Sequence, residues 1–161
     1  MTELYLLRHA HAGDPLAWDG PDELRPLSDK GEKQADRLAQ FLAGVGFQPD
    51  AIITSPMVRA AQTAEIVGHR LGVPVRMDER LGGELGIESL ERVLRDAGDP
   101  QRPVIVGHDP DFSELVAILC ETTQALMRKG SLARVDVGRP LEPGAGTLRW
   151  LVPPDLLKPE R

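Results

Sequence analysis

Cysteine is nearly absent from this chain. The single residue, Cys120, excludes a framework of intramolecular disulfide bonds. Apolar runs are short, and none approaches the roughly 20 residues that a membrane-spanning helix needs. The N-terminus lacks a basic stretch followed by an apolar one, which argues against a secretory signal. These absences predict a cytoplasmic protein with no membrane partner.

Positive charge is also scarce. The net charge is −6, and Lys and Arg do not gather into a long run. Proteins that bind nucleic acid usually carry a clustered basic face. We therefore expect no nucleic-acid partner.

The chain does have the composition of an ordinary globular domain. Its 161 residues are 41% hydrophobic and 27% charged, which is enough for one core. Apolar strands alternate with helical patterns, which predicts a single α/β domain whose mostly parallel central sheet has helices on both faces. This domain spans residues 1–152. Residues 153–161 are predicted to form a short polar tail of low order.

Apolar runs and capping residues locate the individual elements. The strands are predicted at residues 4–7, 51–54, 74–77, 103–106, 133–137 and 147–152. Helices are predicted to begin near Asp29, at Pro56, near Ile87 and at Pro110, the last with Asp109 as its N-cap.

Two histidines and two arginines lie where these strands end. Arg8 and His9 follow the first strand, Arg59 lies in the first turn after the second strand, and His108 ends a later strand. In open parallel sheets, ligands bind beyond the carboxyl ends of the strands. We therefore expect these four side chains to converge at one edge.

This set of residues suits phosphoryl transfer. Arginine forks bind phosphoryl oxygens bidentately and keep their charge at any working pH. The helix predicted to start at Pro56 adds backbone N–H groups and a positive dipole end. A neutral imidazole can attack phosphorus, and a second histidine can stabilise charge in the transition state. The scheme requires neither a metal nor a cofactor.

Four segments of the chain also match, in order, the motifs of one known family. They are Arg8-His9-Ala10, Leu27-Ser28-x-x-Gly31-x-x-Gln34-Ala35, Thr54-Ser55-Pro56-x-x-Arg59-Ala60-x-Gln62-Thr63-Ala64 and Val104-Ile105-Val106-Gly107-His108. In these segments the chain resembles the histidine phosphatase superfamily, the phosphoglycerate-mutase-like group. The short stretch between Arg59 and His108 resembles the small phosphohistidine phosphatases of that family.

The resemblance implies a role for each site residue. His9 would accept the phosphoryl group, while Arg8, Arg59 and His108 would bind it. The implied activity is hydrolysis of phosphohistidine on a protein substrate through a covalent phosphohistidine intermediate. Hydrolysis of a small phosphoester is an alternative, and a non-catalytic module that binds phosphorylated proteins is another. Larger members of the family carry an inserted helical lid between the positions of Arg59 and His108, which this chain lacks. The resemblance therefore favours the protein substrate, because the site would be open to a bulky partner.

The chain departs from the family pattern at two points. Ala10 replaces the usual glycine, and alanine would be strained there if the backbone needs a positive φ. The proton-donating acid of larger members has no firm counterpart, and the candidates are Glu84, Asp19 and Asp22.

Three further residues have open roles. His9-Ala10-His11 could be read as a metal motif, but the chain is short for a metal hydrolase of the barrel type. His11 is therefore expected at the pocket rim or the surface. Trp18 could line the site entrance or pack in a surface loop. Arg25 could contact substrate or hold its own loop in place.

Overall fold

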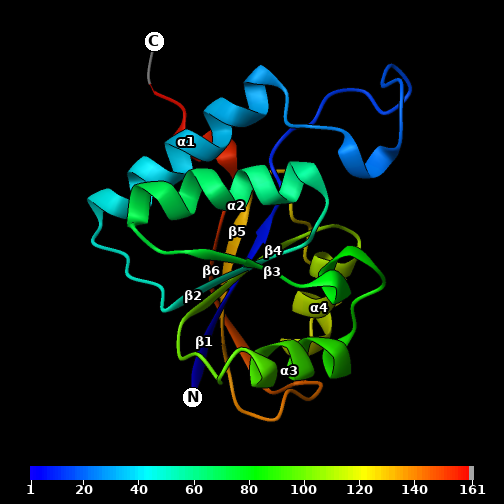
Figure 1. Cartoon of the computed structure of the whole chain (residues 1–161). Helices are drawn as coiled ribbons and strands as arrows, with labels where there is room; N and C mark the ends of the chain where they lie inside the picture. Colours follow the sequence, from blue (N-terminus) through cyan, green and yellow to red (C-terminus); the bar gives the residue numbers. More distant parts are fainter. Residues whose placement is uncertain (160–161) are drawn as a thin grey trace.

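The computed structural model describes residues 1–159, which form one α/β domain (Figure 1). The strands are β1 (Thr2–Arg8), β2 (Ala51–Thr54), β3 (Val75–Met77), β4 (Pro103–Gly107), β5 (Leu132–Val137) and β6 (Gly146–Val152). The helices are α1 (Asp29–Gly44), α2 (Val58–Leu71), α3 (Ile87–Asp96) and α4 (Asp111–Leu119), with short 3-10 turns η1 (Asp22–Leu24), η2 (Glu79–Gly82) and η3 (Pro154–Leu157).

The strands form one sheet in the order β3-β2-β4-β1-β5-β6. The strands from β3 to β1 pair in parallel, whereas β5 runs antiparallel to both of its neighbours. The prediction of a mostly parallel sheet is confirmed. The central position of β1 and β4 follows from their buried apolar sequences, because such strands need neighbours on both sides.

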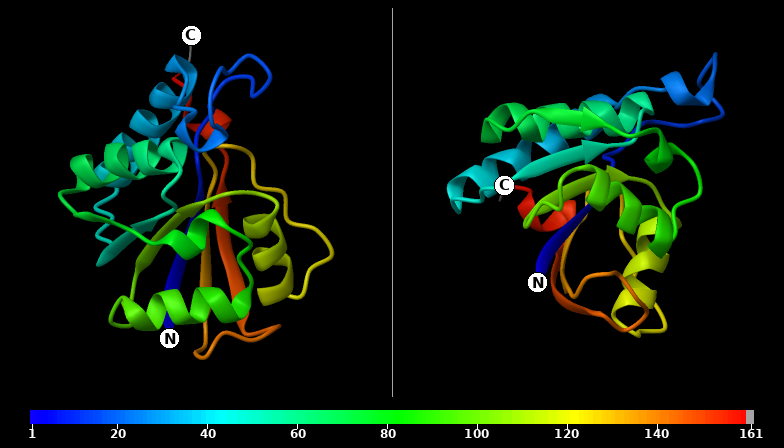
Figure 2. Two further views of the ribbon diagram at one scale, coloured as in Figure 1. Left: turned by 45° about the vertical axis from the view of Figure 1, so that its right-hand side comes forward. Right: turned by 60° about the horizontal axis from the view of Figure 1, so that its bottom comes forward.

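Helices cover both faces of the sheet, as predicted (Figure 2). Successive side chains of a strand point to opposite faces. Leu4 and Leu6 of β1 therefore join the core beneath α3 and α4, while Tyr5 and Leu7 join the core beneath α1 and α2. Each face of the sheet therefore contributes to its own hydrophobic core, and the ends of the strands lie outside the packing of helices on these faces.

Two helices begin later than predicted. The start of α2 is Val58 instead of Pro56, because the backbone of Met57 is extended, with φ −61° and ψ 135°, and Met57 takes the N-cap position. The start of α4 is Asp111, and Pro110 occupies the N-cap position predicted for Asp109. The Asp109 carboxylate nevertheless accepts from the Ser113 N–H at 3.1 Å, which satisfies a backbone donor of the first turn.

The C-terminal segment is more structured than expected. Its turn η3 packs beside α1, with Pro154 buried and Leu157 against the α1–α2 core. Glu160 and Arg161, the end of the predicted tail, lie outside the described residues. Across residues 1–159, no helix is long and apolar enough to span a membrane.

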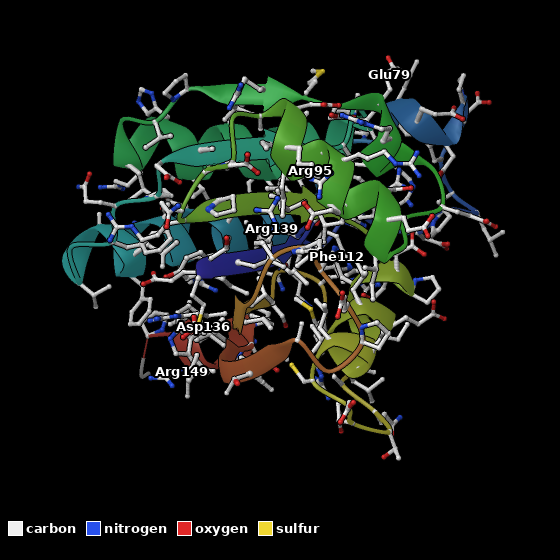
Figure 3. The ribbon with its side chains drawn as sticks, turned by 90° about the horizontal axis from the view of Figure 1, so that it is seen from below. Glu79, Arg95, Phe112, Asp136, Arg139 and Arg149 are labelled. Carbon is white, nitrogen blue, oxygen red and sulfur yellow. The ribbon has the colours of Figure 1, made fainter. Side chains whose placement is uncertain are left out.

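The buried carboxylate of Glu91 forms an ion-pair cluster at one end of the sheet. The site histidines lie at the opposite end. Glu91 of α3 accepts hydrogen bonds from Arg139 at 2.8 Å, from Arg95 at 3.1 Å and from the Leu141 N–H at 2.7 Å. Arg139 comes from the β5–β6 connection, and Figure 3 shows it close to Arg95. The bond from Arg139 is the main reason why the pKa of Glu91 falls to about 2. This cluster joins the β5–β6 connection to α3.

Candidate active site

Three neighbouring strands end side by side at the candidate site. In the sheet, β4 lies between β2 and β1, and Arg8 pairs with Gly107. The His9 N–H continues this pairing by donating to the Gly107 carbonyl at 3.0 Å, and the Ser55 N–H donates to the Val106 carbonyl at 2.9 Å. The sheet register therefore brings the first residue after each strand to one place.

His9 is buried, with 6% of its surface exposed. Its Nδ1 lies 2.8 Å from the Ala10 carbonyl oxygen, which can only accept a hydrogen bond. Nδ1 therefore carries the proton, and Nε2 keeps a free lone pair. Burial is the main reason why the pKa of His9 falls to about 3, and the charges of His108, Arg59 and Arg8 lower it further. The ring is neutral at ordinary pH, as a nucleophile must be.

His108 lies beside His9, with the two ring centroids 5.2 Å apart. Its Nε2 is 2.8 Å from the Ser55 hydroxyl, which fixes the direction of the ring. Burial lowers the pKa of His108 to about 4, and Arg59 and Arg8 add to the effect. Gly107 leaves no room for a side chain, because a Cβ there would lie 2.7 Å from the Phe112 ring. The close approach of Phe112 explains the glycine before His108.

In each site arginine a terminal guanidinium nitrogen is hydrogen-bonded, whereas the Nε–H donor is unpaired among residues 1–159. Arg8 donates to the Met127 carbonyl at 2.7 Å and lies 3.7 Å from Asp109. Arg59 donates to the Asp22 carbonyl at 2.8 Å and to its carboxylate at 3.0 Å. The buried Nε atoms of Arg8 and Arg59 have no hydrogen-bond partner among the described residues. Since an unpaired buried donor is costly, these two N–H groups are suited to an incoming oxyanion.

The remaining motif residues support the loop that follows His9. The Ala10 N–H donates to the Thr63 hydroxyl at 3.1 Å, and the His11 N–H donates to the Gln34 side chain at 3.0 Å. Gln62 accepts from the Leu27 N–H at 2.8 Å. These contacts fix the loop to both α1 and α2 and so position His9.

Gly31 has a related role at the start of α1. A Cβ at this position would collide with the His11 carbonyl oxygen. Only glycine lets the first turn of α1 lie against the loop, which accounts for its place in the motif.

Ala10 is accommodated without strain. Its φ is not positive, and its side chain is fully buried beside Leu27 and Ala35. The position therefore does not need the conformational freedom of glycine, and alanine adds a small apolar contact.

Among the three candidate acids, only Asp22 contacts the site. Its carboxylate pairs with Arg59 and also accepts from Arg25 at 3.1 Å. The Arg25 hydrogen bond is the largest cause of its lowered pKa, so Asp22 is charged and a weak proton donor at neutral pH. Asp19 and Glu84 are exposed, and no contact joins either of them to His9.

The residues with open roles have local partners. Arg25 is buried and donates to the Ala12 carbonyl at 2.9 Å, so it holds its loop in place. His11 Nδ1 lies 2.6 Å from the Ser28 hydroxyl, and its side chain is half-buried. Trp18 Nε1 donates to the Pro21 carbonyl at 2.9 Å in the surface loop. Residues 1–159 contain no group of three or more His, Cys, Asp or Glu placed to hold a metal ion.

Two site neighbours were not foreseen from the sequence. Asp109 pairs with Arg8, although its position next to His108 was a signal that we interpreted only as a helix cap. Lys129 is half-buried, and besides burial the charges of Arg8, Arg25, Arg59 and Lys30 lower its pKa. No sequence motif marks Lys129, because its contacts depend on how the chain returns into β5.

Comparison with known proteins defines the class to which this chain belongs. Residues 4–109 match the family model of the histidine phosphatase superfamily, branch 1. The chain therefore belongs to the histidine phosphatase superfamily.

Within that superfamily the chain is similar over nearly its whole length to a phosphohistidine phosphatase. It is 28% identical to SixA of Escherichia coli, over 97% of this chain and 96% of SixA. A solved structure of the protein histidine phosphatase SixA in complex with tungstate superposes with a TM-score of 0.84 at 25% identity, over 98% of this chain and 100% of that one. An uncharacterised protein of Picosynechococcus is 39% identical, over 70% of this chain and 69% of its own. Family membership and the likeness to SixA support phosphatase activity.

Proposed function

We propose that the protein removes the phosphoryl group from phosphohistidine on a protein substrate, with His9 as the acceptor. The observation that carries this proposal is the state of His9: a buried, neutral ring whose Nδ1 is engaged by the Ala10 carbonyl and whose Nε2 is free. The likeness to SixA over both full lengths supports it.

The first chemical step transfers the phosphoryl group to the enzyme. The Nε2 lone pair of His9 attacks phosphorus, and the P–N bond of the substrate breaks with its electron pair going to the substrate imidazole. Arg8 and Arg59 bind the outer oxygens, and His108 donates to them as charge develops. In the second step water attacks phosphorus, the P–Nε2 bond breaks with its electron pair returning to Nε2, and dihydrogen phosphate leaves with the oxygen and both protons of the water.

The leaving group favours phosphohistidine over an alkyl phosphoester. An alkoxide needs a proton from an acid as it departs. A phosphorylated imidazole that carries a proton on its other nitrogen leaves as neutral imidazole and needs no such acid. Asp22, the candidate acid that contacts the site, is a carboxylate engaged by Arg59 and Arg25. The site is therefore better suited to cleaving a P–N bond.

The surroundings of the site suit a bulky substrate. Helices α1 to α4 all contribute to the cores on the two faces of the sheet. The site is bordered by the loop that contains η1 and by the segment before β5, and Arg8 is 22% exposed. A phosphohistidine side chain presented on a protein surface would need this kind of access.

Trapping the phosphoenzyme tests the proposal. The pure protein is mixed with a phosphocarrier protein that carries labelled phosphohistidine. The reaction is quenched rapidly in alkali, in which phosphohistidine is stable, and the labelled residue of the enzyme is located by peptide mapping. Label should appear on His9, turnover should survive excess EDTA, and His9→Asn should show neither label nor turnover. Label on His108 or His11 would assign a different nucleophile. Loss of activity with EDTA and its return with zinc or manganese would support metal chemistry.

The same preparation separates the substrate classes. Faster turnover of a panel of small phosphoesters than of the phosphocarrier protein would contradict the protein-phosphatase proposal. Binding of the phosphorylated protein without turnover of any substrate would indicate a non-catalytic module.

A further inference from the structure

The segment before β5 passes directly against the two residues that begin the site. Met127 accepts a hydrogen bond from the Arg8 guanidinium, and the Gly130 N–H donates to the carbonyls of Arg8 and His9 at 3.1 and 3.0 Å. Lys129 lies between these two anchor points. Because the backbone on both sides of it is fixed to the site, Lys129 is held beside the phosphate pocket.

The charged groups around Lys129 are predominantly cationic. Arg8, Arg25, Arg59 and Lys30 are the charges that lower its pKa, after burial itself. The three arginines of this set pair with Asp22 or Asp109.

The two lysines of this set have no such partner. Neither Lys129 nor Lys30 forms an ion pair with any residue between 1 and 159. The set therefore comprises five cations, Arg8, Arg25, Lys30, Arg59 and Lys129, and its ion pairs involve two carboxylates, Asp22 and Asp109.

This local excess contrasts with the charge of the whole chain, which is −6. The net negative charge of the chain repels an acidic partner, so binding of such a partner depends on the positive charges near the site. The phosphoryl group itself is provided for by the unpaired Nε donors of Arg8 and Arg59. The positive charge of Lys129 is additional to that pocket.

We propose that Lys129 binds a carboxylate on the surface of the phosphoprotein substrate, next to its phosphohistidine, and so determines which proteins are dephosphorylated. This inference rests on the proposed function. A half-buried ammonium without an anionic partner gains most when a partner excludes water and supplies a negative charge. Lys30 lies in the first turn of α1, which also carries Asp29 and Glu32, so Lys129 is the cation of this set on which the proposal rests.

The experiment compares one protein substrate with one small substrate. Lys129→Gln removes the charge and keeps most of the side-chain length, while Lys129→Arg keeps the charge. Arg128→Gln is the matched control, because Arg128 is the cation next to Lys129 in the sequence and it pairs with Asp155, outside the site. Each variant is assayed on an acidic phosphohistidine phosphocarrier protein and on phosphoramidate, which has one phosphoryl group and no carboxylate, over a range of NaCl concentrations.

Lys129→Gln should raise KM for the phosphoprotein by roughly fivefold, leave kcat nearly unchanged and weaken the salt dependence. Its kcat/KM for phosphoramidate should change by less than about threefold, and Lys129→Arg should restore the phosphoprotein KM. Neutralising acidic residues beside the phosphohistidine of the substrate should abolish the difference between the wild-type enzyme and the Lys129→Gln variant.

Other outcomes would overturn the inference. An equal loss on both substrates would place Lys129 in the phosphate pocket, and no loss on either would remove it from binding. A larger loss on a small substrate with a second phosphate than on the phosphoprotein would assign the anion to a small molecule. A wild-type enzyme that hydrolyses phosphoramidate but not the phosphoprotein would instead refute the proposed function.

Discussion

Mild acid should destabilise the folded chain largely through the two histidines of the site. In the unfolded chain, His9 takes up a proton as the pH falls through 6.5, but in the folded chain it does so only near pH 3. Between these values the unfolded state binds more protons, so lowering the pH favours unfolding. The stability is fully present above pH 6.5 and is lost progressively below it.

The size of this effect follows from the interval in pH. At pH 5 the medium is 1.5 units below the unfolded value of 6.5, and each unit of differential protonation contributes about 1.4 kcal/mol. The loss is therefore about 2 kcal/mol for His9. His108, with a folded pKa of about 4, should lose a similar amount. Carboxylates with lowered pKa values, such as Asp22 and Glu91, lose most of their contribution at lower pH.

Urea unfolding at pH 7, 6 and 5 measures the effect. His9→Asn removes the titrating ring, and its amide N–H can still reach the Ala10 carbonyl. Its loss of unfolding free energy from pH 7 to pH 5 should be smaller than that of the wild type by about 2 kcal/mol. His69→Asn, at an exposed position of α2, should keep the wild-type dependence. If His9→Asn showed the full wild-type loss, the folded ring would not be protected from protonation and the reasoning would be wrong.

Three other changes test separate parts of the structure. Arg59→Ala should lower kcat roughly a hundredfold or more, and Arg59→Lys should restore it only in part because an ammonium lacks the planar fork; a fully active Lys variant would show that only charge matters. Gly31→Ala should displace the loop after His9 and lower both stability and turnover, measured by thermal melting and steady-state rates, whereas Gly44→Ala meets no atom within 4 Å and should do neither. Glu91→Gln should cost about 3 kcal/mol in urea unfolding, because Arg139 would lose its buried anionic partner; an unchanged free energy of unfolding would remove the ion pair from the account of stability.

Much of the fold could be predicted because its signals are local. Runs such as 51–54 and 103–106 are short, apolar and rich in β-branched residues, which favours buried strands, and their predicted boundaries were nearly right. The convergence of His9, Arg59 and His108 followed from one rule about strand ends. Helix starts were less predictable, because the extended backbone of Met57 delays α2 past Pro56 and no residue pattern in this segment marks it.

Long-range contacts explain what the sequence could not show. The tail was expected to be poorly ordered from its prolines, but Leu157 packs against the α1–α2 core, a contact that only the folded domain creates. The pairing of Asp22 with Arg59 joins residues 37 positions apart, and no pattern in the loop distinguishes Asp22 from Asp19. The environment of Lys129 was equally unpredictable, because the cations that surround it come from four different segments of the chain.

The reversed direction of β5 has a consequence for how such a protein can diversify. Because β5 opposes β1, the chain must re-enter the sheet at the end where His9 stands, and residues 121–131 span that approach. They lie beyond residues 4–109, the stretch shared with the superfamily model. Changes there that keep the contacts of Met127 and Gly130 with Arg8 and His9 would leave the parallel strands and the candidate site intact. Under the proposed role of Lys129, transplanting this segment between relatives would exchange their preferred partners and conserve the reaction.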